Sequence, residues 1–340
     1  MTQPDVTPVD IDVLVIGAGV IGLTTAICLA EAGVRTSIAA AELPQQTTSA
    51  AAGAIWGPHL VGMDDRVARW ASVTLARFAE YSAPGLGANA LDGVVRTASG
   101  IAASREAGAG PPEFAAGTAL AACEPAEIPP GYRSAWRLSA PIVAMPEYLD
   151  YLAQRYDRAG GATPFRAKIG RLSDARVLAP SARVIVNCTG CGACELVPDP
   201  DVTPVRGQVV VMSNPGITEF FVGTAPDPSD LTYLFPHRDV VVLGGTEQPG
   251  NWSREPDPAT AAKIIAACAA VRPELRGATV VEHRVGLRPA RPSVRLAAEL
   301  GDGVTFVHNY GHGGSGVTLS WGCAEDAAAL ALEALGAALA

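Results

Sequence analysis

The sequence predicts an α/β fold, in which a domain with a parallel sheet is interleaved with a second, α+β domain built on a mixed or antiparallel sheet. Three short apolar runs rich in β-branched residues, at 11–16, 183–187 and 304–308, are typical of strands buried on both faces of a parallel sheet. Strand candidates at 231–236 and 240–244 lie between them and suit an antiparallel meander. Because the two kinds of strand alternate along the chain, we expect one domain assembled from separated segments, with the other inserted between them.

The remaining elements follow from periodicity and from helix breakers. Residues 23–32 have strong helical character, Gly33 suits their C-cap, and strand 34–40 completes a β-α-β unit at the start of the chain. Helical spacing and apolar runs predict the other elements, which in chain order are a helix at 67–81, a strand at 93–97, a helix at 146–159, strands at 164–169 and 208–212, a helix at 260–271 and a last helix from 316 to the end.

Composition excludes several classes of protein. The 340 residues include 25 basic and 34 acidic ones, and the net charge of −9 argues against nucleic acid as a partner. With 49% hydrophobic and 17% charged residues, the chain is not disordered. No apolar stretch suffices to span a bilayer, and residues 1–10 lack the pattern of a signal peptide. Seven cysteines, an odd number, indicate reduced thiols, so we expect a cytoplasmic protein without a membrane partner.

A glycine-rich loop joins the first strand to the first helix. Gly17, Gly19 and Gly22 form the pattern GxGxxG in its full strand–loop–helix context, which is typical of dinucleotide binding. Gly17 permits the tight turn, Gly19 lets a pyrophosphate approach the backbone, and Gly22 lets helix and strand pack closely. The helix N-terminus, which includes Val20 and Ile21, supplies free amides and partial positive charge.

The end of the second strand is where such folds carry an acidic residue for the ribose. Glu42 is the first carboxylate there, and it either hydrogen-bonds the ribose hydroxyls or is a solvated loop charge; the sequence leaves both open. Since no Arg or Lys lies in that stretch to hold a 2′-phosphate, NADP is disfavoured.

A second glycine run, GHGGSG at 311–316, makes the pattern specific. Together with VLVIGAGVIGLTTA it makes the chain resemble the D-amino-acid oxidase family of FAD enzymes. Further matching stretches occur in family order across nearly the whole chain: TTSAAAGAIWGP (47–58), VIVNCTG (184–190), PVRGQVV (204–210), YLFP (233–236), LGGTEQPGNW (243–252), GLRPARP (286–292) and HNYGHGGSGVTLSWGCA (308–324).

The resemblance implies a Rossmann-like FAD-binding domain and an interleaved substrate-binding domain. We expect residues 1–60, 141–200 and 286–340 in the first, and 61–140 and 201–285 in the second. The family oxidises D-amino acids to imino acids, which yield 2-oxo acids and ammonia, while oxygen reoxidises FAD and gives hydrogen peroxide. None of the expected contacts is a positioned general base, which fits direct hydride transfer from Cα to flavin N5.

Three residues are expected to orient the substrate. A carboxylate is best bound by the planar, permanently charged fork of Arg, and the resemblance assigns this role to Arg288. It also implies that the Tyr233 hydroxyl shares the carboxylate and that the Gly314 carbonyl lies near the amine. Arg291 and Arg295 are alternatives to Arg288, and a core aromatic is the alternative for Tyr233.

The resemblance also implies the set of residues around FAD, including Thr318 near the flavin pyrimidine carbonyl, where a helix N-terminus stabilises negative charge. The expected cofactor-binding residues are Gly17, Gly19, Val20, Ile21, Gly22, Glu42, Thr47, Thr48, Ala52, Gly53, Ile55, Cys188, Thr189, Gly190, Gly311, Gly313, Gly314, Ser315, Gly316, Val317 and Thr318.

The pocket for the substrate side chain is expected to include His59, Ser229, Glu247 and Ser315, beside the orienting residues. His59 is either a specificity residue or a partly buried polar group. Glu247 stands where D-aspartate oxidases tend to carry arginine, and a carboxylate there repels acidic substrates. We therefore expect neutral D-amino acids as substrates, with basic ones as a second option. A D-aspartate oxidase, a glycine- or sarcosine-type amine oxidase and a non-enzymatic flavin or dinucleotide sensor are the alternatives.

Two clusters invite a metal interpretation. Cys188, Cys191 and Cys194 form CxxCxxC, but no adjacent Cys or His offers a fourth ligand, so we expect no metal and leave a redox-active thiol pair open. His308 and His312 lie on a strand-to-glycine turn, where stabilisation of the turn is favoured over metal binding. Members of the family are often dimers, and the sequence leaves the choice between monomer and homodimer open.

Overall fold

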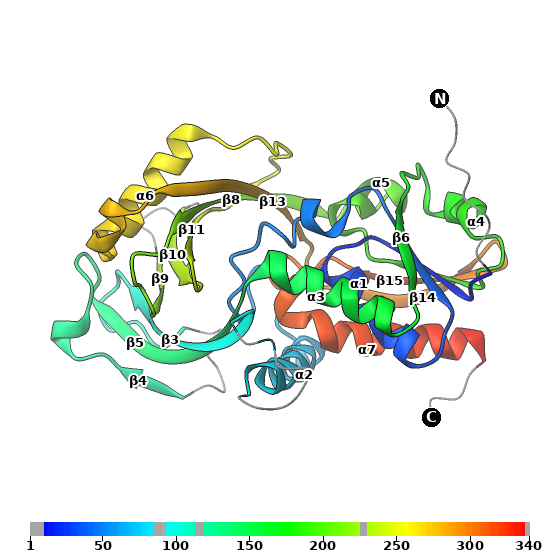
Figure 1. The fold of residues 1–340 in the computed structure, drawn as a ribbon, viewed down its shortest axis with the longest axis horizontal. Helices are drawn as coiled ribbons and strands as arrows, with labels where there is room; N and C mark the ends of the chain where they lie inside the picture. The colour runs from blue at the N-terminus through cyan, green and yellow to red at the C-terminus, as the bar shows by residue number, and fades with distance from the viewer. Residues whose placement is uncertain (1–9, 84–90, 92, 113–118, 225–229, 337–340) are drawn as a thin grey trace.

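The computed structural model describes residues 10–83, 91, 93–112, 119–224 and 230–336. Their strands form a six-stranded sheet, in the right half of Figure 1, and a nine-stranded sheet, in the left half. Ser229 lies outside the described residues. The predicted α/β architecture is confirmed.

The six-stranded sheet is parallel except at one edge. Its first and central strand continues into the glycine loop, and only β14 runs antiparallel, against β15. In spatial order its strands are β14 (Arg295–Gly301), β15 (Val304–Tyr310), β7 (Val184–Asn187), β1 (Val13–Ile16), β2 (Thr36–Ala40) and β6 (Ala162–Arg166). The apolar runs that predicted a parallel sheet are its β1, β7 and β15.

Four helices share a core with one face of this sheet: α1 (Val20–Glu31), α2 (Asp65–Ser82), α3 (Met145–Arg158) and α7 (Gly316–Leu335). Leu23 and Ile27 of α1 are fully buried there, and α1 packs against both α3 and α7. On the opposite face, Leu14 and Ile185 pack with residues of the short helix α4 (Ala175–Leu178). Burial on both sides explains why β1 is apolar and buried at every position.

Helix α2 departs from the predicted domain division, which placed 61–140 in the second domain. Its Trp70 and Phe78 are buried in the core of the six-stranded sheet, and α2 lies against α7. The two helices can approach this closely because Gly322 of α7 has no side chain: a Cβ there would lie 2.3 Å from the Trp70 Cα. The apolar face of α2 is thus covered by a helix that follows it by more than 230 residues, a pairing that local periodicity does not reveal.

The nine-stranded sheet is mixed, because β3 pairs parallel with β9 while the other pairs are antiparallel. The predicted meander at 231–236 and 240–244 is confirmed, with Leu234 paired to Leu243. The strands are β12 (Gln248–Pro249), β8 (Thr203–Ser213), β11 (Val240–Thr246), β10 (Asp230–Pro236), β9 (Phe220–Thr224), β3 (Val95–Ser104), β5 (Ser134–Val143) and β4 (Leu120–Ala122), with β13 (Val280–Ala290) paired to β8. Helix α6 (Pro258–Val271) covers one face.

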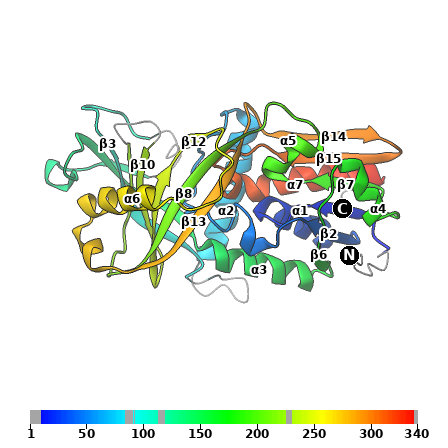
Figure 2. The same cartoon turned by 90° about the horizontal axis from the view of Figure 1, so that it is seen from above.

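Strand β8 is longer than the strand predicted at 208–212, and β13 is a strand that the sequence does not predict; the two pair with each other from Thr203 to Met212 of β8. They extend from the nine-stranded sheet toward the six-stranded one (Figure 2). The end of β13 therefore reaches the edge of the six-stranded sheet where β1, β2, β7 and β15 have their carboxyl ends.

No helix of the described ranges combines the length and the apolar character needed to cross a membrane.

Candidate active site

A cavity of about 560 Å³ lies at this edge, and both sheets line it. The residues that follow β1, β2, β7 and β15 form one side, and Tyr233, Phe235 and Arg288 of the second sheet form the other. Ligand sites of open α/β sheets occur at the carboxyl ends of the strands, and their volumes span about 300–1,000 Å³. The cavity is therefore the candidate active site.

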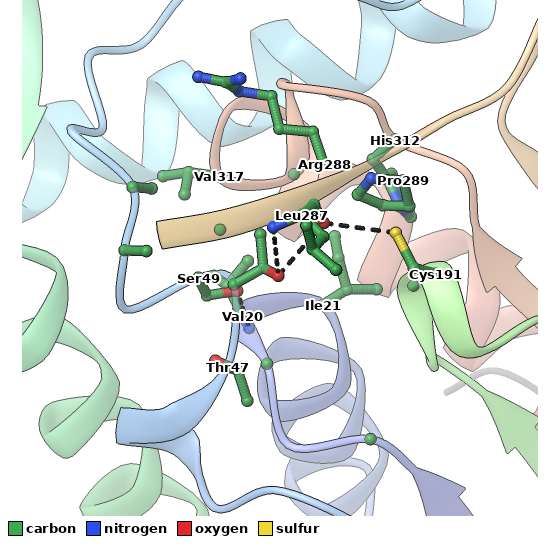
Figure 3. Close-up of a pocket in the computed structure, with 18 of the residues that line it drawn as sticks. Val20, Ile21, Thr47, Ser49, Cys191, Leu287, Arg288, Pro289, His312 and Val317 are labelled. Atoms are coloured by element: carbon green, nitrogen blue, oxygen red, sulfur yellow. Dashed lines mark hydrogen bonds between the residues drawn. The ribbon is translucent and has the colours of Figure 1, made fainter. Parts of the chain in front are cut away.

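The glycine loop opens the first turn of α1 toward the cavity. Gly19 is the N-cap of α1 and provides no side-chain cap; the Val20 amide donates to Ser49 Oγ at 3.0 Å (Figure 3). Gly17 has a φ of 113°, and a Cβ at Gly22 would lie 1.9 Å from the Gly17 carbonyl oxygen. Gly22 does not line the cavity, so its part is the close packing of helix on loop.

Glu42 does line the cavity, and it is not a lone carboxylate. Its two oxygens accept from both terminal nitrogens of Arg254, with Nη2 3.1 Å from Oε2. Arg254 follows β12 in the second sheet and was not predicted, because nothing in the sequence relates two residues that are 212 positions apart.

The segment that follows β2 lies along the cavity and is fixed from both sides. The Thr48 hydroxyl bonds the amide and the carbonyl of Leu287 on β13, each at 3.2 Å. A Cβ at Gly53 would lie 2.8 Å from the Phe235 ring. Thr47, Ala52 and Ile55, which the sequence predicts around the cofactor, line the same wall.

The turn after β7 contributes Cys188, Thr189 and Gly190 to the wall. Burial raises the pKa of Cys188 and of Cys191 to about 12, so both are neutral thiols. The Cys191 thiol faces the Leu287 carbonyl oxygen at 3.4 Å. No group of three or more His, Cys, Asp or Glu side chains in the described segments could hold a metal ion.

The second glycine run divides between wall and support. Gly313, Gly314, Gly316, Val317 and Thr318 line the cavity, whereas Gly311 and Ser315 do not.

Two hydroxyls of this region are hydrogen-bonded to backbone groups. Ser315 is fully buried; its Oγ donates to the His59 carbonyl at 2.8 Å and accepts from the His59 amide. The Thr318 hydroxyl is likewise engaged, with the amide and the carbonyl of Gly57. The predicted role of Ser315 in the pocket therefore needs correction: its side chain fixes the position of His59.

His312 lies between these glycines and is fully buried. Burial lowers its pKa to about 3, so the imidazole is neutral, and its Nε2 has no hydrogen-bond partner within the described parts of the chain. Asn309 Oδ1 is unpartnered in the same sense. Both residues line the cavity. Buried polar atoms are almost always paired, so these two indicate a polar ligand, and with the open helix end they fit a dinucleotide cofactor.

Arg288 reaches into the cavity from β13, away from Leu287 and Cys191 (Figure 3). Its Nη1 donates to the Thr246 carbonyl at 3.0 Å, and no Asp or Glu of the described residues forms an ion pair with it. By contrast, Arg291 and Arg295 both pair with Asp199, at 3.1 and 3.6 Å. Of the three candidate arginines, Arg288 is the one whose charge remains available to a ligand.

Tyr233 is buried beside Arg288 and stacks on Phe235, with ring centroids 4.7 Å apart. Burial raises the pKa of Tyr233 and outweighs the opposite effect of the Arg288 charge, so the phenol is neutral. Glycines provide the space for both side chains: a Cβ would lie 1.8 Å from the Tyr233 ring at Gly244 and 2.4 Å from Arg288 Nη1 at Gly207.

His59 and Glu247 form a close pair at the same end of the site. His59 Nε2 lies 2.6 Å from Glu247 Oε1, in an alignment that is not that of a hydrogen bond. Burial acts to raise the pKa of Glu247, but His59 and Arg288 lower it by more, so the carboxylate stays charged. His59 lines the cavity and Glu247 lies behind it.

The His59 ring also packs against the glycine run. A Cβ at Gly314 would lie 2.5 Å from the His59 ring carbon Cδ2. The pair thus borders the space between Arg288 and Gly314.

Comparison with known proteins agrees with this geometry. Residues 12–330 match the family model described as FAD dependent oxidoreductase. The chain is 47% identical to a D-amino-acid oxidase of Rubrobacter xylanophilus, over 95% of this chain and 96% of that one. It is 45% identical to a D-amino-acid oxidase of Streptomyces coelicolor, over 95% and 97%.

More distant relatives share the fold. Human D-aspartate oxidase is 34% identical over 94% of both chains. The solved structure of glycine oxidase from Geobacillus kaustophilus superposes with a TM-score of 0.79, at 18% identity, over 97% of this chain and 96% of that one. The chain belongs to the D-amino-acid oxidase family of FAD-dependent oxidoreductases.

Proposed function

We propose that the protein oxidises neutral D-amino acids to 2-oxo acids, ammonia and hydrogen peroxide, and that basic D-amino acids are a second class of substrate. The observation that carries the proposal is the half-buried guanidinium of Arg288, which enters the cavity without a carboxylate partner among the described residues. A planar fork of this kind binds a carboxylate through two parallel hydrogen bonds.

Arg288 and the Tyr233 hydroxyl hold the substrate carboxylate from one side. The Gly314 carbonyl oxygen accepts a hydrogen bond from the amine. With both the carboxylate and the amine held, the orientation of the Cα–H bond is fixed. None of these groups takes a proton from Cα, so their work is orientation. When bound, FAD supplies the acceptor for the hydride that leaves Cα, and oxygen then takes the electrons as hydrogen peroxide.

The residues around the cavity fit FAD. The Val20 amide is bonded to Ser49, so the Ile21 amide at the first turn of α1 would face a pyrophosphate. Glu42 would offer carboxylate oxygens to ribose hydroxyls, and the unpartnered His312 Nε2 would offer a further polar contact at the cavity wall. The neutral state of His312 means that it brings no charge to the flavin.

Substrate charge is selected by the Glu247 carboxylate. The negative charge of Glu247 lies near Arg288 and weakens the attraction of this region for a second carboxylate on the substrate. D-Aspartate is therefore a poor substrate in this proposal. Neutral side chains meet the His59 ring, and cationic ones meet the carboxylate behind it.

The test is an oxidase assay over paired D- and L-amino acids, with glycine and sarcosine included and hydrogen peroxide as readout. We expect turnover of D-alanine, D-valine, D-phenylalanine and D-lysine, and little turnover of D-aspartate or of any L-enantiomer. Turnover of D-aspartate well above these would favour a D-aspartate oxidase, and a preference for glycine or sarcosine would favour an amine oxidase. If the protein holds FAD but no amino acid bleaches the flavin under anaerobic conditions, the protein would be a sensor.

We also propose that the protein works in the cytoplasm. All seven cysteines are free thiols, and three of them, Cys188, Cys268 and Cys323, are buried. Unpaired thiols in a chain of this size suit a reducing compartment.

A further inference from the structure

The loop between β12 and α6, residues 250–257, is irregular but held firmly. Its anchor is Arg206 of β8, which is 3% exposed. Arg206 Nε donates to the Ser253 carbonyl at 3.0 Å and Nη2 to the Glu255 carbonyl at 2.6 Å. These two carbonyls flank Arg254, so a buried guanidinium fixes the backbone on both sides of that residue.

The other contacts of Arg206 extend this support. Its guanidinium donates to the side-chain oxygens of Gln248 and Gln208, each at 2.9 Å. Gln208 in turn bonds both the amide and the carbonyl of Asp257, also at 2.9 Å. A buried cation is costly unless its donors are satisfied, and here they are satisfied by one loop and its neighbours. The loop is therefore preorganised, and it presents the Arg254 side chain to the cavity.

Arg254 reaches from the second sheet to the first at the end of the cavity that Glu42 lines, which we call the nucleotide end. Both of its terminal nitrogens bond the Glu42 carboxylate, and Nη2 also faces the Gln46 carbonyl at 3.3 Å. Gln46 is held by Arg166 of β6, whose Nη2 donates to its Oε1 at 2.6 Å. Glu42 and Arg254 both line the cavity.

We propose that Arg254 is a clasp for the cofactor: its ion pair with Glu42 bridges the two sheets over the nucleotide end of the cavity, and FAD leaves only when this pair opens. The pair also orients Glu42, whose remaining lone pairs can accept from the ribose hydroxyls. The proposal rests on FAD binding and does not depend on which amino acid is oxidised.

The alternative is an ordinary surface ion pair. The side chains of Arg254 and Glu42 are 41% and 39% exposed, and exposed pairs contribute little to folding. A clasp and an incidental pair differ in what they control. The clasp slows release of the cofactor, whereas an incidental pair affects at most the stability of the chain.

The experiment measures FAD release from the holoprotein after dilution, by the rise of flavin fluorescence, for wild type, Arg254→Ala, Arg254→Lys, Glu42→Gln and the double variant. We expect release to be about fivefold faster for Arg254→Ala, since a bidentate charged contact is lost, and intermediate for Arg254→Lys. Gln at position 42 keeps an oxygen that accepts from the ribose hydroxyls and loses only the charge that pairs with Arg254, so Glu42→Gln and the double variant should both release FAD at about the rate of Arg254→Ala. Added salt should speed release from wild type and leave Arg254→Ala unchanged.

Arg69→Ala is the matched control. Arg69 also bonds both oxygens of a carboxylate, Asp326, and joins α2 to α7 away from the cavity. It should release FAD at the wild-type rate. Equal rates for wild type and Arg254→Ala, or additive effects of the two clasp substitutions, would overturn the proposal. Because no amino acid is present, either result leaves the proposed oxidase activity untouched.

Discussion

Arg288 is the residue on which substrate binding depends most. Arg288→Lys keeps the positive charge but loses the planar fork, so we expect KM for D-alanine to rise by about tenfold or more; Arg288→Ala should raise it by about a hundredfold. The same loss should appear in kcat/KM measured by the peroxide assay. The Thr246 carbonyl already fixes the Arg288 guanidinium in the cavity, so the substitutions remove a group that is positioned before the substrate binds.

Arg291→Lys makes the same chemical change three positions later. Because Arg291 is already paired with Asp199, this control should leave KM within about twofold of wild type. A large effect at Arg291 together with a small one at Arg288 would mean that the carboxylate is bound elsewhere.

Glu247 determines the sign of charge near the substrate side chain. Glu247→Arg should raise kcat/KM for D-aspartate by more than about tenfold and lower it for D-lysine, because the repelling carboxylate becomes a cation. Glu247→Gln removes the charge without reversing it and should lie between the two. If all three proteins show the same ratio of D-aspartate to D-lysine turnover, Glu247 does not select substrates.

The site residues differ in how well the sequence predicts them. Residues inside contiguous motifs, such as Gly17, Thr48 and Arg288, do line the cavity, and their place could be predicted because the motif itself carries the backbone geometry. Ser315 was placed in the pocket, but its hydroxyl is used by the His59 backbone, which depends on a fold-back over 256 positions. Arg254 could not be found at all, since its partner Glu42 approaches only when the two sheets come together.

Among the elements, the buried strands were the most predictable. β1 and β7 are buried along their whole length, and β15 at most of its positions, so short apolar runs identify these strands without knowledge of their neighbours in the sheet. β13 carries exposed residues along its first half, from Val280 to His283, and has no such pattern. It forms because β8 offers a ladder of hydrogen bonds, so tertiary pairing decides it.

The junction of β1 and α1 gives the sharpest prediction at this scale. Gly22→Ala should destabilise the protein by about 1–3 kcal/mol and weaken FAD binding, because the added Cβ meets the Gly17 carbonyl at 1.9 Å, where only the backbone can yield. Urea unfolding and flavin content of the purified protein measure the two effects. Gly277→Ala is the control: a Cβ there has no atom within 4 Å, so both quantities should stay at the wild-type level.

At the scale of the whole molecule, the cavity exists because two sheets with different requirements meet. The parallel sheet provides amides and glycines at its carboxyl edge, and the mixed sheet brings Tyr233 and Arg288 to the same space through β10 and β13. Neither sheet alone contains both halves of the site. Binding of the cofactor is therefore expected to stabilise the arrangement of both sheets together, by an amount that grows with the logarithm of its free concentration.

Buried neutral histidines make the folded molecule sensitive to acid. Burial, reinforced by Arg96 and Arg284, lowers the pKa of His237 to about 4, against 6.5 for an ordinary histidine. Below pH 6.5 the unfolded chain therefore binds a proton that the folded chain refuses, so stability falls as pH falls toward 4. His237 alone should cost about 2 kcal/mol of unfolding free energy between pH 8 and pH 5. Most carboxylates titrate below this window, which separates their contribution.

Urea unfolding of the FAD-saturated protein at a series of pH values measures this loss, and His237→Asn should remove at most about half of the slope, because the buried His312 contributes a similar loss. His237 lies at the turn between β10 and β11, outside the cofactor cavity, so the variant tests stability without altering the site. An NMR titration of the His237 ring in the wild type gives the same answer without a substitution. A ring that titrates near pH 6.5 in the folded protein would show that His237 is hydrated and that the acid sensitivity has another origin.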